Sequence, residues 1–269
     1  RGHPRLRMRH VPFAVTPTAK EHWLMHMHAA LDEAKLPPMH DAAFQSLREG
    51  MALLGARDDE RALQSFHVAA DRFRALGYRT GEADALAMAG SIYAQTKRDE
   101  EALLAFTEVV HLRDDETETA ARAAALSNRG LVLARLGRYE EAIACFEEAR
   151  LRYEQAGELL RSAGQWANIG TVHRDMNQPQ SALESYRQAL AIYRQLGHGE
   201  RVGDQLSNIA YALVCLQRAA DALPWYREAL AHYIEAKDTP RIDKTVDNIN
   251  RLVAALSRRS DTPGSYCCG

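Results

Sequence analysis

The chain has 269 residues, of which 46% are hydrophobic and 26% are charged, so it has ample apolar material for a folded core. The formal net charge of -2 argues against a general nucleic-acid surface, because binding phosphates requires clustered Lys and Arg. No segment resembles a membrane span or a signal peptide, and the four cysteines are too few and too scattered for a disulfide framework. We therefore expect a cytoplasmic protein that is neither membrane-inserted nor exported.

The first eleven residues form a basic segment with four arginines, two histidines and no acid. Such a run is either a solvated loop or a site for an anionic group. Thr18 and Glu21 then make a capping box, which predicts that a helix begins there and ends at Pro37-Pro38. Its buried face is predicted to carry Trp23, Met27, Leu31 and Ala34.

A second helix is predicted from about Met39 to Leu54, and it has two apolar faces. The main stripe consists of Phe44, Leu47, Met51 and Leu54, and the small-residue face consists of Ala43, Gly50 and Leu53. We expect one face to pack on Trp23 and Met27 and the other on the following helix. No Gly/Ser-rich linker separates the two parts, so the helix is predicted to be shared by them rigidly.

The run from Gly2 to His10 reads Gly-His-Pro-Arg-Leu-Arg-Met-Arg-His, and Pro12-Phe13, Trp23-Leu24 and Met27 follow it. Over about residues 1–54 this sequence resembles the C-terminal part of a group II truncated haemoglobin. The resemblance implies that His10 is the proximal haem-iron ligand and that Trp23 lines the distal pocket. The rest of that pocket would lie upstream of Arg1, so we expect an N-terminally incomplete chain that binds haem only in the intact protein.

Without this resemblance, His10 in a basic loop would be read as a surface residue. A second histidine group, formed by His22, His26 and His28, is predicted to be structural, because no carboxylate or cysteine completes a zinc-type set. The sequence therefore predicts no metal site apart from His10 as a haem-iron ligand.

From about residue 40, the same residue types return every forty positions. One register holds small residues, at Gly50, Gly90, Gly130, Gly170 and Ala210. Two further registers hold alanines and aromatics, at Ala62, Ala102, Ala142, Ala182 and Ala222 and at Phe66, Phe106, Phe146, Tyr186 and Tyr226. A fixed period of this length is typical of a solenoid, in which stacked helix pairs bury the faces that no single pair can bury.

This order of small residue, turn, alanine and aromatic resembles the tetratricopeptide repeat over about residues 40–258, with Trp166 also at a position where that family often has tryptophan. The resemblance implies an all-α, right-handed solenoid of antiparallel helix pairs, preceded by a partial globin-like segment. The pairs are predicted at about 40–77, 80–117, 120–157, 160–197 and 200–237, followed by a capping helix at 240–257 and a disordered tail at 259–269.

Two local features qualify this scheme. Pro224 lies about a turn into a predicted helix, so it is expected to kink that helix or to delay its start. Cys267 and Cys268 are either a redox pair, a metal handle or, as we expect, part of an inert tail.

A fourth register places asparagines on the first helix of each later pair, away from the packing stripe: Asn128, Asn168, Asn208 and Asn248. In the repeat family the first helices line a concave groove, so the resemblance implies an asparagine ladder in that groove. A carboxamide both donates and accepts, which suits the main chain of an extended peptide. We expect this ladder to bind a partner peptide, with selectivity from Arg135, Asp175, Tyr211 and Arg251. The alternative is that the asparagines bond to neighbouring helices and fix the stacking.

Two functional classes follow. The chain is predicted to be a protein-interaction scaffold attached to a truncated-globin domain in the intact protein. The alternative is a haem-based gas-binding or gas-sensing protein in which the repeats transmit or localise the signal. No phosphate loop or nucleophile set indicates an enzyme, and no nucleic-acid or membrane partner is expected. The sequence does not define the oligomeric state.

Overall fold

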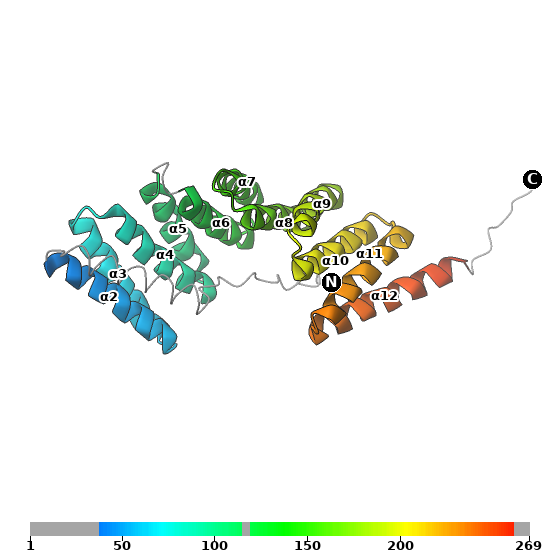
Figure 1. Cartoon of the computed structure of the whole chain (residues 1–269), viewed down its shortest axis with the longest axis horizontal. Helices are drawn as coiled ribbons and strands as arrows, with labels where there is room; N and C mark the ends of the chain where they lie inside the picture. Colours follow the sequence, from blue (N-terminus) through cyan, green and yellow to red (C-terminus); the bar gives the residue numbers. More distant parts are fainter. Residues whose placement is uncertain (1–37, 115–118, 261–269) are drawn as a thin grey trace, which may run out of the picture. The chain divides into compact units, whose positions relative to one another are not determined.

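The helices repeat at the interval that the sequence predicts. A computed structural model describes residues 38–114 and 119–260, and the regular elements in those residues are all α-helices (Figure 1). Of the positions predicted to bind haem or metal, His10 and Trp23 lie outside the described residues, as do the N-terminal histidine group and Cys267-Cys268. Within the described part of the chain, no helix combines the length and the apolar character needed to cross a membrane.

Two compact units make up the chain, residues 1–132 and residues 133–269, and the division falls inside α6 (Thr119–Arg135). The described helices that lie wholly within the first unit are α2 (Pro38–Gly55), α3 (Asp59–Ala75), α4 (Arg79–Gln95) and α5 (Asp99–Leu112). Those within the second unit are α7 (Tyr139–Gln155), α8 (Leu159–Asp175), α9 (Pro179–Gln195), α10 (Gly199–Cys215), α11 (Ala219–Glu235) and α12 (Thr239–Ser260). Within each unit, helices that follow one another in the sequence pack together.

Short turns join successive helices, and each described turn contains a residue in the left-handed conformation. At the end of α3, Gly77 has φ 69°; its N–H donates to the Arg74 carbonyl at 3.0 Å, and the Tyr78 N–H donates to the Phe73 carbonyl at 2.9 Å. These bonds satisfy carbonyls that the helix end leaves unpaired. Connections this short make successive helices antiparallel neighbours.

The small-residue register lies where two helices of a pair approach most closely. A methyl group added at Gly50 would lie 2.8 Å from the ring of Phe66, and one at Gly170 would lie 2.6 Å from the ring of Tyr186. Both rings are fully buried. The forty-residue lattice therefore pairs a missing side chain on the first helix with an aromatic ring on the second, and this pairing sets the distance between them.

Helix α2 packs on the repeats through both of its apolar faces. Gly50 lies against Phe66, while Phe44 contacts Phe73, with ring centroids 4.9 Å apart, and Tyr78, with centroids 6.1 Å apart. The prediction that one of these faces packs on Trp23 and Met27 falls on residues outside the described ranges and stays a prediction. Helix α2 is thus a full member of the first helix pair.

The C-terminal helices differ from the prediction at two points. Helix α11 begins at Ala219 and contains Pro224, so the predicted delay of its start is wrong; the proline removes one donor without stopping the helix. Helix α12 runs from Thr239 to Ser260 instead of 240–257, so the first residues of the predicted tail are helical.

Candidate ligand-binding face

The asparagine register lies on the first helices of the second unit. Asn168, Asn208 and Asn248 occupy equivalent positions on α8, α10 and α12, and all three side chains are half-buried. We call the surface that they share the Asn face. Asn128 is also half-buried and lies in α6, within the first unit.

Contacts at both ends show that α8, α10 and α12 lie side by side. Near the C-terminal ends, Tyr211 of α10 is close enough to Arg174 and Asp175 of α8 to feel their charges. Near the N-terminal ends, Arg241 of α12 forms ion pairs with Glu200 and Asp204 of α10. Because equivalent residues on aligned helices face the same way, the three asparagines follow one another across this surface.

The hydrogen bonds at the Asn face show whether the asparagines bond to neighbouring helices, as the alternative role in stacking requires. The Asn168 amide donates to Gln165 Oε1 at 3.4 Å, one turn away in the same helix. The carboxamides of Asn208 and Asn248 make no hydrogen bond to any residue that the structure describes. No bond from these asparagines to a neighbouring helix therefore supports the stacking role. Their binding role remains a prediction.

A glutamine row lies beside the asparagines, and the sequence reading did not single it out. Gln165 and Gln205 are both about 95% buried, at 5% and 4% exposure. Gln165 accepts from Asn168 and donates to the Arg161 carbonyl at 3.2 Å, but the buried Oε1 of Gln205 has no partner in the described structure. The forty-residue spacing of these two residues was a signal available in the sequence.

The predicted selectivity residues Asp175 and Tyr211 do come together. Asp175 pairs with Arg174 at 2.9 Å, and Tyr211 lies near Cys215. Burial raises the pKa of the Tyr211 hydroxyl, and its interactions with Cys215 raise it further, so this hydroxyl stays neutral near pH 7 and keeps a proton to donate. Arg251 is exposed on α12, and Arg135 is half-buried at the end of α6. Neither arginine contacts Asp175 or Tyr211 in the described structure.

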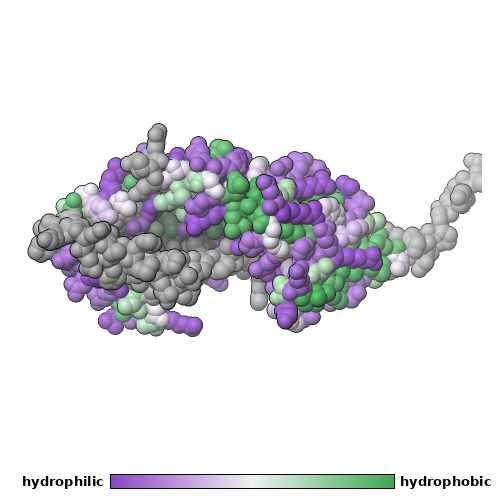
Figure 2. Space-filling model, in the orientation of Figure 1, coloured by the Kyte–Doolittle hydropathy of each residue, from purple (hydrophilic) through white to green (hydrophobic). Residues whose placement is uncertain are grey.

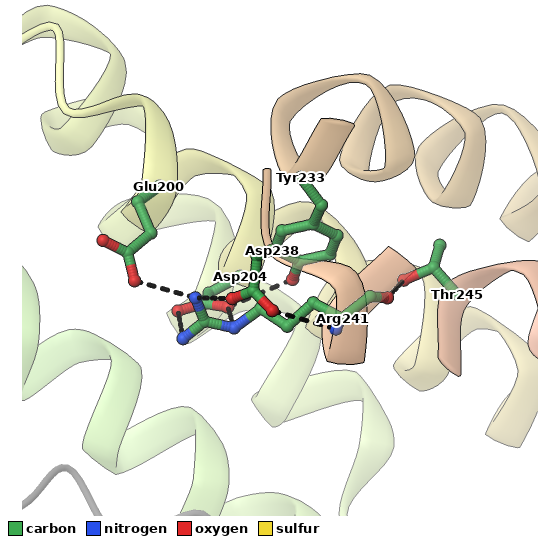
Figure 3. A network of polar contacts seen from close by, with 6 residues as sticks. All are labelled: Glu200, Asp204, Tyr233, Asp238, Arg241 and Thr245. Atoms are coloured by element: carbon green, nitrogen blue, oxygen red, sulfur yellow. Dashed lines mark hydrogen bonds and ion pairs between the residues drawn. The ribbon is translucent and has the colours of Figure 1, made fainter. Parts of the chain in front are cut away.

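At the opposite end of the Asn face, Arg241 holds three carboxylates (Figure 3). Its guanidinium lies 2.7 Å from Glu200, 3.2 Å from Asp204 and 2.8 Å from Asp238, and the Tyr233 hydroxyl donates to Asp204 at 3.0 Å. The hydrogen bond from Arg241 lowers the pKa of Glu200, because it stabilises the carboxylate. This network ties α12 to α10 and to the end of α11.

The same arrangement recurs earlier in the second unit. Arg161 lies over the ring of Tyr153 at 5.7 Å, as Arg241 lies over Tyr233 at 5.7 Å. Each arginine follows its tyrosine by eight residues. The sequence reading missed this tyrosine–arginine register, although its forty-residue period was visible. We interpret it as a structural joint between successive pairs, since its arginines are engaged with aromatic and acidic neighbours.

Known proteins share both parts of this organisation. Family models described as tetratricopeptide repeat match residues 83–115, 121–195 and 202–236, and one described as bacterial-like globin matches residues 1–52. The chain is a tetratricopeptide-repeat protein of all-α, solenoid type, in which a segment matching bacterial globins precedes the repeats. Both resemblances predicted from the sequence are thereby confirmed. Comparison with curated proteins gives no match.

Solved structures agree on the fold. The apo form of RapI has a TM-score of 0.70 at 15% identity, with 81% of this chain and 84% of RapI covered. Kinesin-light-chain TPR-like repeats from Podosopora anserina have a TM-score of 0.63 at 13% identity, with 76% of this chain and all of that one covered. A Rap protein in complex with competence and sporulation factor has a TM-score of 0.59 at 12% identity, with 81% and 65% covered. Identities this low show a similarity of fold alone.

Among the described residues, no group of three or more His, Cys, Asp or Glu side chains is arranged to hold a metal ion. Neither of the two described cysteines forms a disulfide within the described residues; Cys145 is buried and Cys215 is exposed.

Proposed function

We propose that the chain is an interaction scaffold whose Asn face binds an extended peptide segment of another protein. The observation that carries the proposal is that the carboxamides of Asn208 and Asn248 are half-exposed on aligned helices and make no hydrogen bond within the described structure. Each carboxamide offers one acceptor and two donor hydrogens, which match a peptide N–H and C=O. Such contacts engage any main chain and place no demand on its side chains.

The surroundings of the ladder favour some peptides over others. Near Asp175, the neutral Tyr211 hydroxyl would donate a hydrogen bond to a peptide carbonyl, and its ring offers an apolar contact surface. The exposed Arg251 would add positive charge at another part of the face. A structural neighbour, the Rap protein solved in complex with competence and sporulation factor, is a chain of this fold that holds a ligand, and this supports the proposal by analogy of fold.

A single peptide of known sequence allows binding to the Asn face to be measured quantitatively. A random peptide library displayed on phage would be selected against the full chain, and the affinity of one selected synthetic peptide would be measured by calorimetry. Replacing Asn168 and Asn208 together with Ala should weaken binding by roughly 30-fold or more, since each lost hydrogen bond contributes on the order of 1 kcal/mol. Circular dichroism and the melting temperature should change little.

The matched control removes two exposed carboxamides from the second-helix side of the array, by Gln188→Ala and Gln195→Ala. It should leave the affinity unchanged. If the Asn168/Asn208 variant loses its fold, the asparagines serve stacking; if it folds and binds as well as the unaltered chain, the peptide binds elsewhere.

A second candidate function concerns the segment that precedes the repeats, and the bacterial-like globin match over residues 1–52 favours it. We propose that the intact protein binds haem there, with His10 as the iron ligand and Trp23 beside the haem, and that the repeats localise this gas-binding part or pass on its signal. Haem would supply the iron that binds a diatomic gas. A haem titration of the intact protein and of its His10→Ala variant tests the role of His10. A histidine-ligated absorption band that His10→Ala removes would support it, and identical spectra for both chains would contradict it.

A further inference from the structure

Two buried side-chain amides lie next to the Asn face, at a position where other repeats do without them. Gln165 of α8 and Gln205 of α10 are 5% and 4% exposed. The equivalent positions of α4, α6 and α12 hold smaller buried residues, Ala85, Ala125 and Thr245. Burying an amide costs free energy unless the amide is hydrogen-bonded. Since alanine fills this position in two other repeats, packing alone does not account for the glutamines.

The two glutamines differ in their hydrogen bonds. The Nε2 of Gln165 donates to the Arg161 carbonyl at 3.2 Å, and its Oε1 accepts from the Asn168 amide at 3.4 Å. The buried Oε1 of Gln205 accepts no hydrogen bond in the described structure, and the carboxamide of Asn208, three residues further on, makes none there either. An unpaired buried acceptor is costly, and the donor that would relieve this cost lies one turn away.

We propose that Gln205 positions Asn208 for the peptide, by accepting one of its N–H groups in the complex. This inference rests on the proposed function of the Asn face. In α8 the same two residue types, at the same spacing and on an equivalent helix, already form this bond. Residues three apart are neighbours on a helix surface, so the bond is open to α10 as well.

Peptide binding changes the partners that are left for Asn208. In the free chain its half-exposed carboxamide can bond to water. A bound peptide covers the carboxamide and takes its oxygen and one N–H, so the second N–H needs an acceptor inside the protein. The Oε1 of Gln205 is a buried acceptor without a donor. Closing the pair satisfies both groups and fixes the direction of the carboxamide, which adds to the affinity for the peptide.

Replacing Gln205 with Met separates positioning from a structural role. Methionine adapts to buried sites and has no strong acceptor, so it removes the unpaired oxygen and keeps the bulk. Gln205→Met should therefore keep or raise the melting temperature of the full chain, whereas loss of a structural glutamine would lower it. Calorimetry with the selected synthetic peptide should show binding weakened by about fivefold, the effect of one hydrogen bond. Gln205→Ala, which introduces the residue found at positions 85 and 125, should weaken binding likewise.

The side-chain NH2 signals of the peptide complex report on each pair separately. Gln205→Met should shift the NH2 signals of Asn208 and leave those of Asn168 in place, and Gln165→Met should do the reverse. A general loosening of the array would move both sets. The matched control is Gln188→Met, because Gln188 is exposed on α9, whose outward residues are mainly hydrophilic (Figure 2). It should change neither the affinity nor these signals.

The positioning role is overturned if Gln205→Met binds the peptide as tightly as the unaltered chain, or if the Asn208 signals of its complex do not shift. A joint loss of melting temperature and affinity in both Gln205→Met and Gln205→Ala would also overturn it, since the glutamine would then be structural. The Asn168/Asn208→Ala variant is measured beside them. If that variant binds normally, the proposed function fails and the positioning role with it; if it is weakened while Gln205→Met is not, the positioning role alone fails.

Discussion

Residues in the left-handed conformation recur at the helix ends of this protein, and several of them are not glycine. Gly77, Gly157 and Gly197 have φ near 70°, while Lys97 and Gln217 have φ of 64° and 60° at equivalent turns. A side chain in this region costs about 1 kcal/mol relative to glycine, because its Cβ crowds the backbone. The turns with a non-glycine residue in this conformation are therefore strained, and the turns with glycine are not.

We predict that Gln217→Gly stabilises the chain by about 0.5–1 kcal/mol, less than the full strain because glycine gains entropy in the unfolded state. Urea unfolding measures this difference. The reciprocal change, Gly157→Ala, should destabilise by a similar amount. Equal midpoints for the two variants and the unaltered chain would show that these turns are not strained.

Glycines inside helices serve a different purpose, namely close packing. At Gly170 an added methyl group would meet the buried Tyr186 ring at 2.6 Å, so Gly170→Ala should destabilise by about 1–3 kcal/mol through overpacking. At Gly164 the nearest atom is the Tyr193 hydroxyl at 3.7 Å, so Gly164→Ala should be neutral or up to about 1 kcal/mol stabilising, because alanine favours the helix. If the Tyr186 ring sets the spacing between α8 and α9, Gly170→Ala should lower the melting temperature, whereas Gly164→Ala should leave it unchanged or raise it.

At the scale of the element, much of the architecture was predictable. The forty-residue registers predicted the helix pairs and their turns, because one small residue and one aromatic must meet in every pair. The contacts of Phe44 were not predictable, since its stripe alone does not say which neighbour fills the space beside it. The Arg241 network was equally hidden, because it depends on α10 and the turn before α12 bringing Glu200, Asp204 and Asp238 to one guanidinium.

The Arg241 network predicts a dependence on pH. Its hydrogen bond lowers the pKa of Glu200, so the stabilisation is present above the unfolded-state pKa of about 4.3 and is lost as the pH falls through the lower folded-state value. Arg241→Gln should therefore destabilise by about 1 kcal/mol at pH 7, a modest effect because Glu200 is 54% exposed. The difference should shrink below about pH 4. A difference that persists unchanged at low pH would assign the loss to packing instead of charge.

At the scale of the whole molecule, the stability of each helix should depend mainly on the helices that lie next to it. Each helix contacts mainly the helices before and after it in its unit, as in other repeat arrays. Helix α12 covers the end of the second unit through Thr245 and Leu252, which are 2% and 7% exposed.

Removing α12, by ending the chain after Asp238, should expose that end. Hydrogen exchange should then rise in α10 and α11 and leave α2, α3 and α4 unchanged, because the loss acts only on neighbours. Mass spectrometry of the exchanged peptides measures this directly. A uniform rise over both units would mean that the chain unfolds as one cooperative body.

The side-chain carboxamides themselves report on whether the Asn face binds a peptide main chain. Two-dimensional 15N correlation NMR resolves side-chain NH2 groups, which can be assigned by single Asn→Gln replacements. Titration with a selected peptide should shift the signals of Asn168, Asn208 and Asn248 with one common affinity and leave that of the exposed Gln188 in place. Saturable binding that moves other signals but none of these three would contradict the account.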